Sequence, residues 1–116
     1  MKYTIPEVPP SNNRFSGREN VWEYRNEKQR WIHLVQVFCR PKPREPLAKA
    51  VVTLRYFFGR HVRRDPDNYS GKMVLDGLVA SGILKDDSFD CITLRIEQGG
   101  FDKHNPRTEI EIEEPL

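Results

Sequence analysis

Acidic and basic side chains of the kinds that bind phosphate and divalent metals are concentrated in one part of the chain. They are, in chain order, Arg63, Arg64, Asp65, Asp67, Asn68, Lys72, Asp76, Asp86 and Asp87. Magnesium is a hard cation that takes oxygen ligands from one or two carboxylates, from water and from substrate phosphate. In an extended segment residues i and i+2 point to the same side, so Asp65 and Asp67 can converge on a single ion.

The same aspartates also suit ordinary turn chemistry. Asp67 or Asn68 could cap the helix that follows, and Asp65 could form an Asx turn. An isolated Asp-x-Asp-Asn sequence is used in this way more often than as a metal site. A calcium EF-hand does not fit, because Ser70 stands where that loop requires glycine.

The residues beyond these aspartates have two interpretations as well. Lys72 and Asp76 are spaced for an i, i+4 surface ion pair, although a lysine at the edge of the apolar stripe could also reach a phosphate beside a metal. Asp86 and Asp87 could form a simple turn or supply a ligand, and the sequence leaves open which of the two would be the ligand. What favours chemistry is the set of acids before a helix, a lysine in its first turns and an acidic pair after its end.

The sequence shows no residue pattern that indicates another kind of catalytic or metal site. Cys39 and Cys91 lie in apolar stretches without metal-ligand spacing, so we expect free thiols in a cytoplasmic protein. His33, His61 and His104 lack zinc-hydrolase spacing. The chain shows no Gly-rich phosphate loop, no GxSxG elbow, no secretory signal and no apolar run long enough to cross a membrane.

Positive charge is concentrated in the middle of the chain. Residues 40 to 64 carry eight Lys and Arg against one acid, a charge of +7, within a chain whose net charge is +2. Residues 86 to 116 carry nine acids against three bases. The basic block suits a polyanionic partner or a solvated surface, and composition alone does not separate the two.

Hydrophobic periodicity predicts the elements that position these residues. Strands are expected at residues 2–5, 48–59, 91–97 and 108–113, and helices at residues 18–40 and 70–81. We expect Trp31, Val35 and Phe38 to form the buried stripe of the first helix. The order β-α-β-α-β-β predicts an α+β fold in which a mixed sheet packs against two main helices, and in which the last two strands form a hairpin. Length predicts a single domain over residues 1–116.

Two separated motifs resemble the RusA family of Holliday junction resolvases, small phage and bacterial enzymes that act on four-way DNA junctions. RRDPDN, then a lysine, VLDGLVASGILKDDS and a strand resemble the family's catalytic core, and VPPSNNR at residues 8–14 resembles its N-terminal signature. Length and element order agree over the whole chain. One departure concerns Lys72, which follows Asp67 by five residues, whereas the better-known form of the family has four.

The resemblance implies a site, a cofactor and partners. Asp65, Asp67 and Asp87 would bind magnesium, for which manganese can substitute, and Lys72 would be the essential lysine. Asn68 and Asp86 would support these ligands. DNA would be held by Arg60, His61, Arg63 and Arg64. The turn of Asn12, Asn13 and Arg14 could contact DNA, pack against the site or be only a structural turn. A homodimer would resolve the junction by paired symmetric nicks during DNA recombination and repair.

Two other functions remain compatible with the sequence. One is a non-catalytic nucleic-acid-binding module, in which the acids are helix caps and surface charges. The other is a metal-dependent nuclease of the same fold that acts on other branched DNA or on RNA, because branch specificity depends on dimer geometry and loop shape rather than on the acids.

Overall fold

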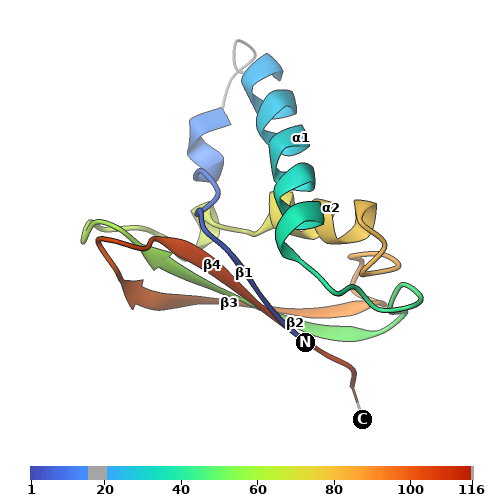
Figure 1. Ribbon diagram of the computed structural model, residues 1–116. Helices are drawn as coiled ribbons and strands as arrows, with labels where there is room; N and C mark the ends of the chain where they lie inside the picture. The colour runs from blue at the N-terminus through green and yellow to red at the C-terminus, as the bar shows by residue number, and fades with distance from the viewer. Residues whose placement is uncertain (16–20, 116) are drawn as a thin grey trace.

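The computed structural model describes residues 1–15 and 21–115 of the chain (Figure 1). Its sheet consists of β1 (Lys2–Ile5), β2 (Ala50–Phe58), β3 (Ile92–Phe101) and β4 (Arg107–Glu113), in the order β1-β4-β2-β3. The described helices are α1 (Val21–Phe38), α2 (Lys72–Ala80) and the short 3-10 helices η1 (Asn12–Phe15) and η3 (Pro66–Asn68). The predicted α+β fold with a mixed sheet and two main helices is confirmed.

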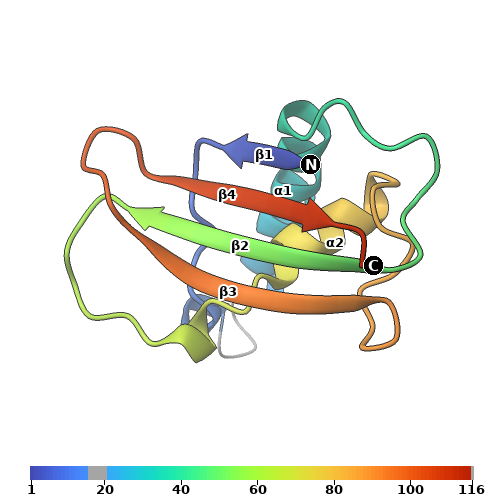
Figure 2. The same cartoon turned by 90° about the horizontal axis from the view of Figure 1, so that it is seen from below.

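Both α helices cover the same face of the sheet and leave the other face open, as Figure 1 and Figure 2 show. Alternation along β2 directs every second side chain toward the helices. The side chains of β2 that are buried in this way are Ala50, Val52, Leu54, Tyr56 and Phe58. They pack against the apolar side of α2 and against Trp31 and Val35 of α1, forming one core.

The connection from β2 through α2 to β3 sets the position of the acidic residues. β2 and β3 are parallel, and their register pairs Ala50 with Ile92 at one end and Phe58 with Phe101 at the other. The segment before α2 therefore leaves one end of the sheet, and the segment after α2 returns to the opposite end.

The predicted hairpin between the last two strands is wrong. β4 pairs antiparallel with both β1 and β2, so β2 lies between β3 and β4. Ile110 and Ile112 of β4 are 1% exposed, which suits an interior strand, whereas most side chains of β3 are exposed, which suits an edge. The buried side chains of β4 require an interior position in the sheet. This requirement outweighs the short connection to β3, which by itself would favour a hairpin.

Close packing of the two helices depends on a glycine. A Cβ atom added at Gly77 of α2 would lie 2.7 Å from Val35 Cγ2, so only glycine allows this approach. Trp31 and Val35 are buried as predicted, but Phe38 is 40% exposed because the helix ends there and Cys39 takes the buried position. The predicted start at Arg18 lies outside the described residues. No described helix is long and apolar enough to cross a membrane.

The basic block of the sequence does not form one surface. Arg55 lies on the open face of the sheet, where its Nε is 2.9 Å from Glu97 Oε2 and its Nη1 is 2.7 Å from Glu111 Oε2. The other basic residues of the block are divided between the segment before β2 and the loop after it. The tertiary structure therefore separates the block into two groups at opposite ends of β2.

The two cysteines are free, as the sequence predicts. Burial raises the pKa of the Cys39 thiol to about 12, so this thiol stays protonated and unreactive at neutral pH.

Candidate active site

The exposed acids Asp65 and Asp67 are displayed by η3. Asp65 is extended, with φ −97° and ψ 133°, and Pro66 begins the 3-10 turn. The Asn68 amide donates to the Asp65 carbonyl at 3.0 Å, so the turn is closed by backbone. Asp65 makes no side-chain cap, and the residue that caps α2 is Gly71 rather than Asp67 or Asn68. The helix-capping alternative for these residues therefore does not describe the structure.

Aromatic rings support η3 from below. Phe58 and Tyr69 meet edge to face with centroids 5.3 Å apart, and Tyr56 lies 6.0 Å from Tyr69. A cavity of about 80 Å³ lies between these rings and Asp65. Burial raises the pKa of Tyr56, whose Oη has no hydrogen-bond partner within the described residues. The acids thus rest on a rigid apolar base.

Two arginines on the loop before η3, Arg63 and Arg64, make different contacts. Arg64 stacks its guanidinium 4.0 Å from the centre of the Phe58 ring and donates to the Arg60 carbonyl at 2.8 Å. Arg63 is exposed, and its Nε lies 3.4 Å from Asp65 Oδ1. His61 stacks on Phe101 with ring centroids 4.1 Å apart. Arg64 therefore shapes the loop, whereas Arg63 projects into solvent beside the acids.

Lys72 begins α2 and forms the predicted i, i+4 ion pair. Its Nζ lies 3.6 Å from Asp76 Oδ2, and Lys28 of α1 approaches the same oxygen at 3.7 Å. The Asp76 side chain is 18% exposed. One carboxylate thus holds two lysines from different helices near the start of α2.

The N-terminal signature reaches the acids through Asn12. Asn12 Nδ2 donates to the Asp67 carbonyl at 3.2 Å and to Ser70 Oγ at 3.3 Å. Arg14 lies in the same turn, where its amide donates to Ser11 at 3.2 Å. The side chain of Asn13 lies outside the described residues. The sequence leaves open whether the turn of Asn12, Asn13 and Arg14 contacts DNA or packs against the site, and the structure shows that Asn12 contacts η3.

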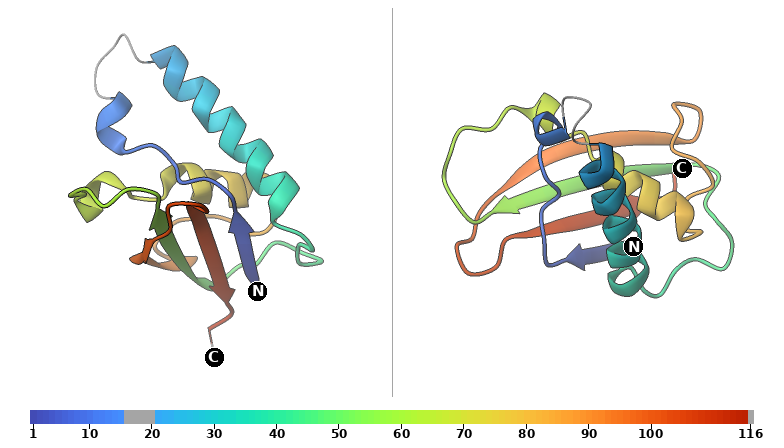
Figure 3. Two further views of the ribbon diagram at one scale, coloured as in Figure 1. Left: turned by 60° about the vertical axis from the view of Figure 1, so that its left-hand side comes forward. Right: turned by 90° about the horizontal axis from the view of Figure 1, so that it is seen from above.

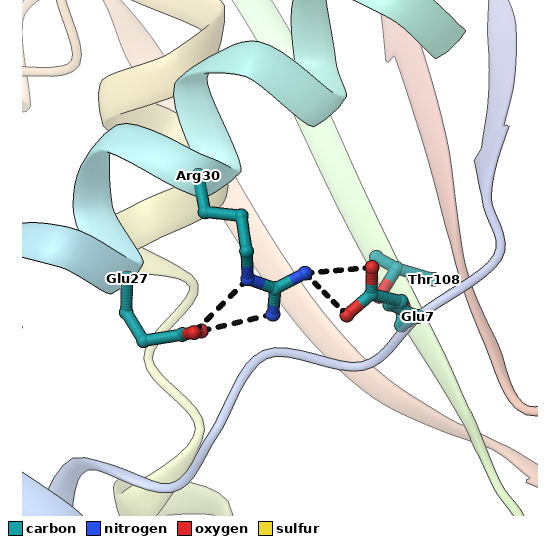
Figure 4. A network of polar contacts seen from close by, with 4 residues as sticks. All are labelled: Glu7, Glu27, Arg30 and Thr108. Atoms are coloured by element: carbon teal, nitrogen blue, oxygen red, sulfur yellow. Dashed lines mark hydrogen bonds and ion pairs between the residues drawn. The ribbon is translucent and has the colours of Figure 1, made fainter.

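A polar network holds the segment before Asn12 against α1 and β4 (Figure 4). Arg30 Nη1 donates to both carboxylate oxygens of Glu7 at 2.7 Å, and its Nε and Nη2 donate to Glu27 at 3.0 Å. Thr108 Oγ1 donates to the Glu7 carbonyl at 2.8 Å. The Arg30 guanidinium lowers the pKa of Glu27, chiefly by hydrogen bonding. This network fixes the course of the chain toward η3.

Asp86 and Asp87 lie at the other end of the sheet. The Lys85 amide donates to the Leu47 carbonyl at 2.9 Å, just before β2 begins. The exposed Asp86 accepts a 2.9 Å hydrogen bond from the Asp87 amide. Figure 2 shows η3 and this connection at opposite ends of β3. Between the two, β2 runs from Ala50 to Tyr56, about 20 Å at the usual rise of a strand.

A single chain does not bring Asp65, Asp67 and Asp87 to one place. Within the described residues, no group of three or more His, Cys, Asp or Glu side chains is placed to hold a metal ion. The structure places Asp65 beside Arg63 and Asp67 on the same turn, it pairs Lys72 with Asp76 at the start of α2, and it keeps Asp87 apart. Two carboxylates on η3 still match what magnesium takes from protein when water and substrate phosphate complete its shell.

A comparison with protein families covers nearly the whole chain. The family model described as endodeoxyribonuclease RusA matches residues 6–113, from the N-terminal signature to the end of β4. No curated protein matches the chain. Since the family match spans nearly all of the sequence and both motifs, the chain belongs to the RusA endodeoxyribonuclease family.

Proposed function

We propose that this protein is a magnesium-dependent endodeoxyribonuclease that resolves four-way DNA junctions by paired symmetric nicks, in recombination and repair. The observation that carries the proposal is the display of Asp65 and Asp67 on one exposed turn, with the Arg63 guanidinium beside Asp65, in a chain of the RusA family. Exposed carboxylates next to cations suit a metal and a phosphodiester at the same place.

Asp65 and Asp67 would hold Mg²⁺, or Mn²⁺ in its place, because their carboxylates are exposed and are not used as helix caps. When bound, the ion activates water and neutralises the oxygen that leaves phosphorus. Arg63, with its exposed guanidinium, would bind a non-bridging phosphate oxygen. Lys72 is held by Asp76 at the start of α2, where its charge offsets the negative charge that develops during attack.

The active unit in this proposal is a homodimer. Asp87 lies at the opposite end of β2 from Asp65 and Asp67, so one chain leaves each acidic group incomplete. A two-fold axis perpendicular to β2 would place opposite ends of two copies side by side, so Asp87 of one copy could join the η3 acids of the other. Such a dimer has two complete sites, which is what symmetric nicking of two strands needs.

Mixing inactive variants tests the shared site. The Asp65→Asn/Asp67→Asn chain and the Asp87→Asn chain should each fail to cleave alone, but their mixed dimer contains one intact site and should nick one strand of a junction. If all three acids act within one chain, the mixture stays inactive. Light scattering should give roughly twice the 13.7 kDa chain mass, and a monomer both free and on junction DNA would contradict the dimer.

The cleavage test uses labelled four-way junction, linear duplex and single strand, each with and without magnesium. Paired nicks in the junction alone, in the presence of magnesium, are expected. Equal cleavage of junction and duplex would point to a nuclease without junction preference. Binding of the junction without any cleavage would identify a non-catalytic binding module.

A further inference from the structure

A larger pocket of about 580 Å³ adjoins the acidic turn. Its walls come from the N-terminal half of α1, the segment before η1, and the chain that leads from η3 into α2. They are formed by Pro9, Pro10, Asn12, Val21, Tyr24, Arg25, Lys28, Tyr69, Ser70, Gly71, Lys72 and Met73. Figure 3 shows η1 beside this half of α1. The size suits a small organic group such as one nucleotide.

The charge of the pocket suits an anion. Arg25, Lys28 and Lys72 line it, and the described residues of its wall include no Asp or Glu. Asp76 does not line the pocket but lies within 3.7 Å of both lysine Nζ atoms, so it holds the two ammonium groups at the wall. Lys28 and Lys72 therefore reach the pocket from different helices, and their ion pairs with Asp76 restrict the positions of their ammonium groups.

Two tyrosines give the pocket an aromatic component. Tyr24 lies on the same face of α1 as Lys28, four residues earlier. Tyr69 is shared, because it also lines the small cavity that contains Asp65. Its ring is braced by Phe58 at 5.3 Å, and Asn12 joins the pocket wall to Asp67. Tyr69 thus separates the pocket from the cavity that Asp65 lines.

We propose that this pocket binds a single unstacked nucleotide of the DNA strand, next to the nucleotide whose phosphodiester meets Asp65 and Asp67. Lys28 binds its phosphate, and its base packs against Tyr24 and Tyr69. Cations combined with aromatic rings are the usual means of holding an unpaired nucleotide. The inference rests on the proposed function, because it assumes that DNA lies on η3.

The pocket gives a reason for junction preference. Taking a base out of a duplex costs unstacking and unpairing free energy, and this cost is least where the base is already unpaired or poorly stacked. Nucleotides at a four-way crossover meet that condition, and those within a continuous duplex do not. A chain that must place one nucleotide in this pocket will therefore bind junctions in preference to duplex.

The test measures junction affinity in metal-free buffer, with the crossover nucleotides either intact or made abasic one at a time. Tyr24→Ala should weaken binding of the intact junction about ten-fold, and it should weaken binding of the correctly placed abasic junction less than two-fold. Tyr24→Leu keeps apolar bulk without the ring and should behave in the same way, which covers the case in which the alanine variant folds poorly.

A further variant distinguishes binding of the phosphate from binding of the base. Lys28→Gln should weaken binding of intact and abasic junctions alike and reduce the salt dependence by about one ion. Lys2→Gln on β1 removes a lysine outside the pocket wall and should bind as the unmodified protein does.

Three results would overturn the inference. Equal losses for Tyr24→Ala on intact and abasic junctions would mean that no base enters the pocket. Unchanged affinity of both Tyr24→Ala and Lys28→Gln would mean that DNA does not reach it, and the proposed function would survive if these variants still cleave. Failure of the unmodified protein to bind any junction would remove the proposed function together with this inference.

Discussion

At the level of single residues, backbone geometry explains why Asp65 and Asp67 are available for chemistry. Their turn is closed by main-chain hydrogen bonds to the Asp65 and Pro66 carbonyls, so neither carboxylate is needed to hold it. Asp76 differs, because it is mostly buried between two lysines. Exposure therefore separates acids that can meet a metal and DNA from an acid that positions side chains.

Asp65→Asn, Asp67→Asn and Asp87→Asn should each lower the cleavage rate by about two orders of magnitude or more, because a neutral amide no longer holds a hard divalent ion. Junction affinity without metal should stay the same or rise, since less negative charge faces the phosphates. Rates come from a gel assay of labelled junction, and Asp90→Asn, exposed in the same region as Asp87, is the control. Cleavage at the unmodified rate by both η3 variants would show that these acids only shape the turn.

Arg63→Ala and Arg64→Ala should have different effects, although they are neighbours. Loss of Arg63 should reduce the slope of log affinity against log salt by about one, because its guanidinium is exposed. Loss of Arg64 should cost roughly 1 kcal/mol of unfolding free energy, because its stacking on Phe58 and its bonds to loop carbonyls disappear. Salt titrations and urea unfolding measure the two effects, and equal salt slopes for both variants would contradict this division.

At the level of elements, the junction between η3 and α2 requires a glycine. Gly71 has φ +76°, and a Cβ atom there would lie 2.4 Å from Leu54 Cδ1 in the core. α2 thus begins at a position where the backbone both turns left-handed and touches β2. This contact sets the distance between the acidic turn and the sheet.

Gly71→Ala should lower the unfolding free energy by about 2–4 kcal/mol, from a left-handed conformation and from overpacking against Leu54. Gly82→Ala is the matched control: its φ is +79°, but the nearest atom to the added Cβ is Lys42 Nζ at 3.9 Å. The control should cost about 1–2 kcal/mol, from conformation alone. Urea unfolding compares the two, and equal losses would show that the Leu54 contact is easily relieved.

At the level of the whole molecule, Glu7 joins the N-terminal segment to α1 and β4: its carboxylate accepts from Arg30 of α1, and its carbonyl accepts from Thr108 of β4 (Figure 4). The segment that it secures leads to Asn12, which contacts the acidic turn. The network therefore joins the N-terminal signature of the family to the core motif across the fold.

This network predicts a pH dependence of stability. The Arg30 hydrogen bonds lower the pKa of Glu27 below its usual value of 4.5, so their contribution to the unfolding free energy is fully present above pH 4.5 and is lost as pH falls through the lowered value. Arg30→Gln should cost about 0.5–1 kcal/mol at pH 7, a modest figure because the pairs are solvent-exposed, and the difference from the unmodified protein should shrink near pH 3. Urea unfolding at both pH values tests this, and a difference that is independent of pH would show that Arg30 acts through packing.

Sequence alone determined the features that depend on neighbours along the chain. The alternating pattern of β2 predicts its buried face, because side-chain direction in a strand follows from local backbone geometry. The extended segment expected at Asp65 and Asp67 is wrong beyond Asp65, because Pro66–Asn68 form a 3-10 turn. The class of fold follows from the order of such elements. The two family motifs are likewise read directly from adjacent residues, and the family match over residues 6–113 agrees with them.

Tertiary structure decided what depends on distant contacts. The place of β4 beside β2 follows from the burial of Ile110 and Ile112, which no local pattern encodes. The parallel crossover through α2 sends Asp87 to the far end of the sheet from Asp65, although α2 between them has only nine residues. Helix α2 runs along the sheet, so Asp65 and Asp87 lie far apart in space although they are close in the sequence. The pocket beside the acids is completed instead by α1, some forty residues earlier in the chain.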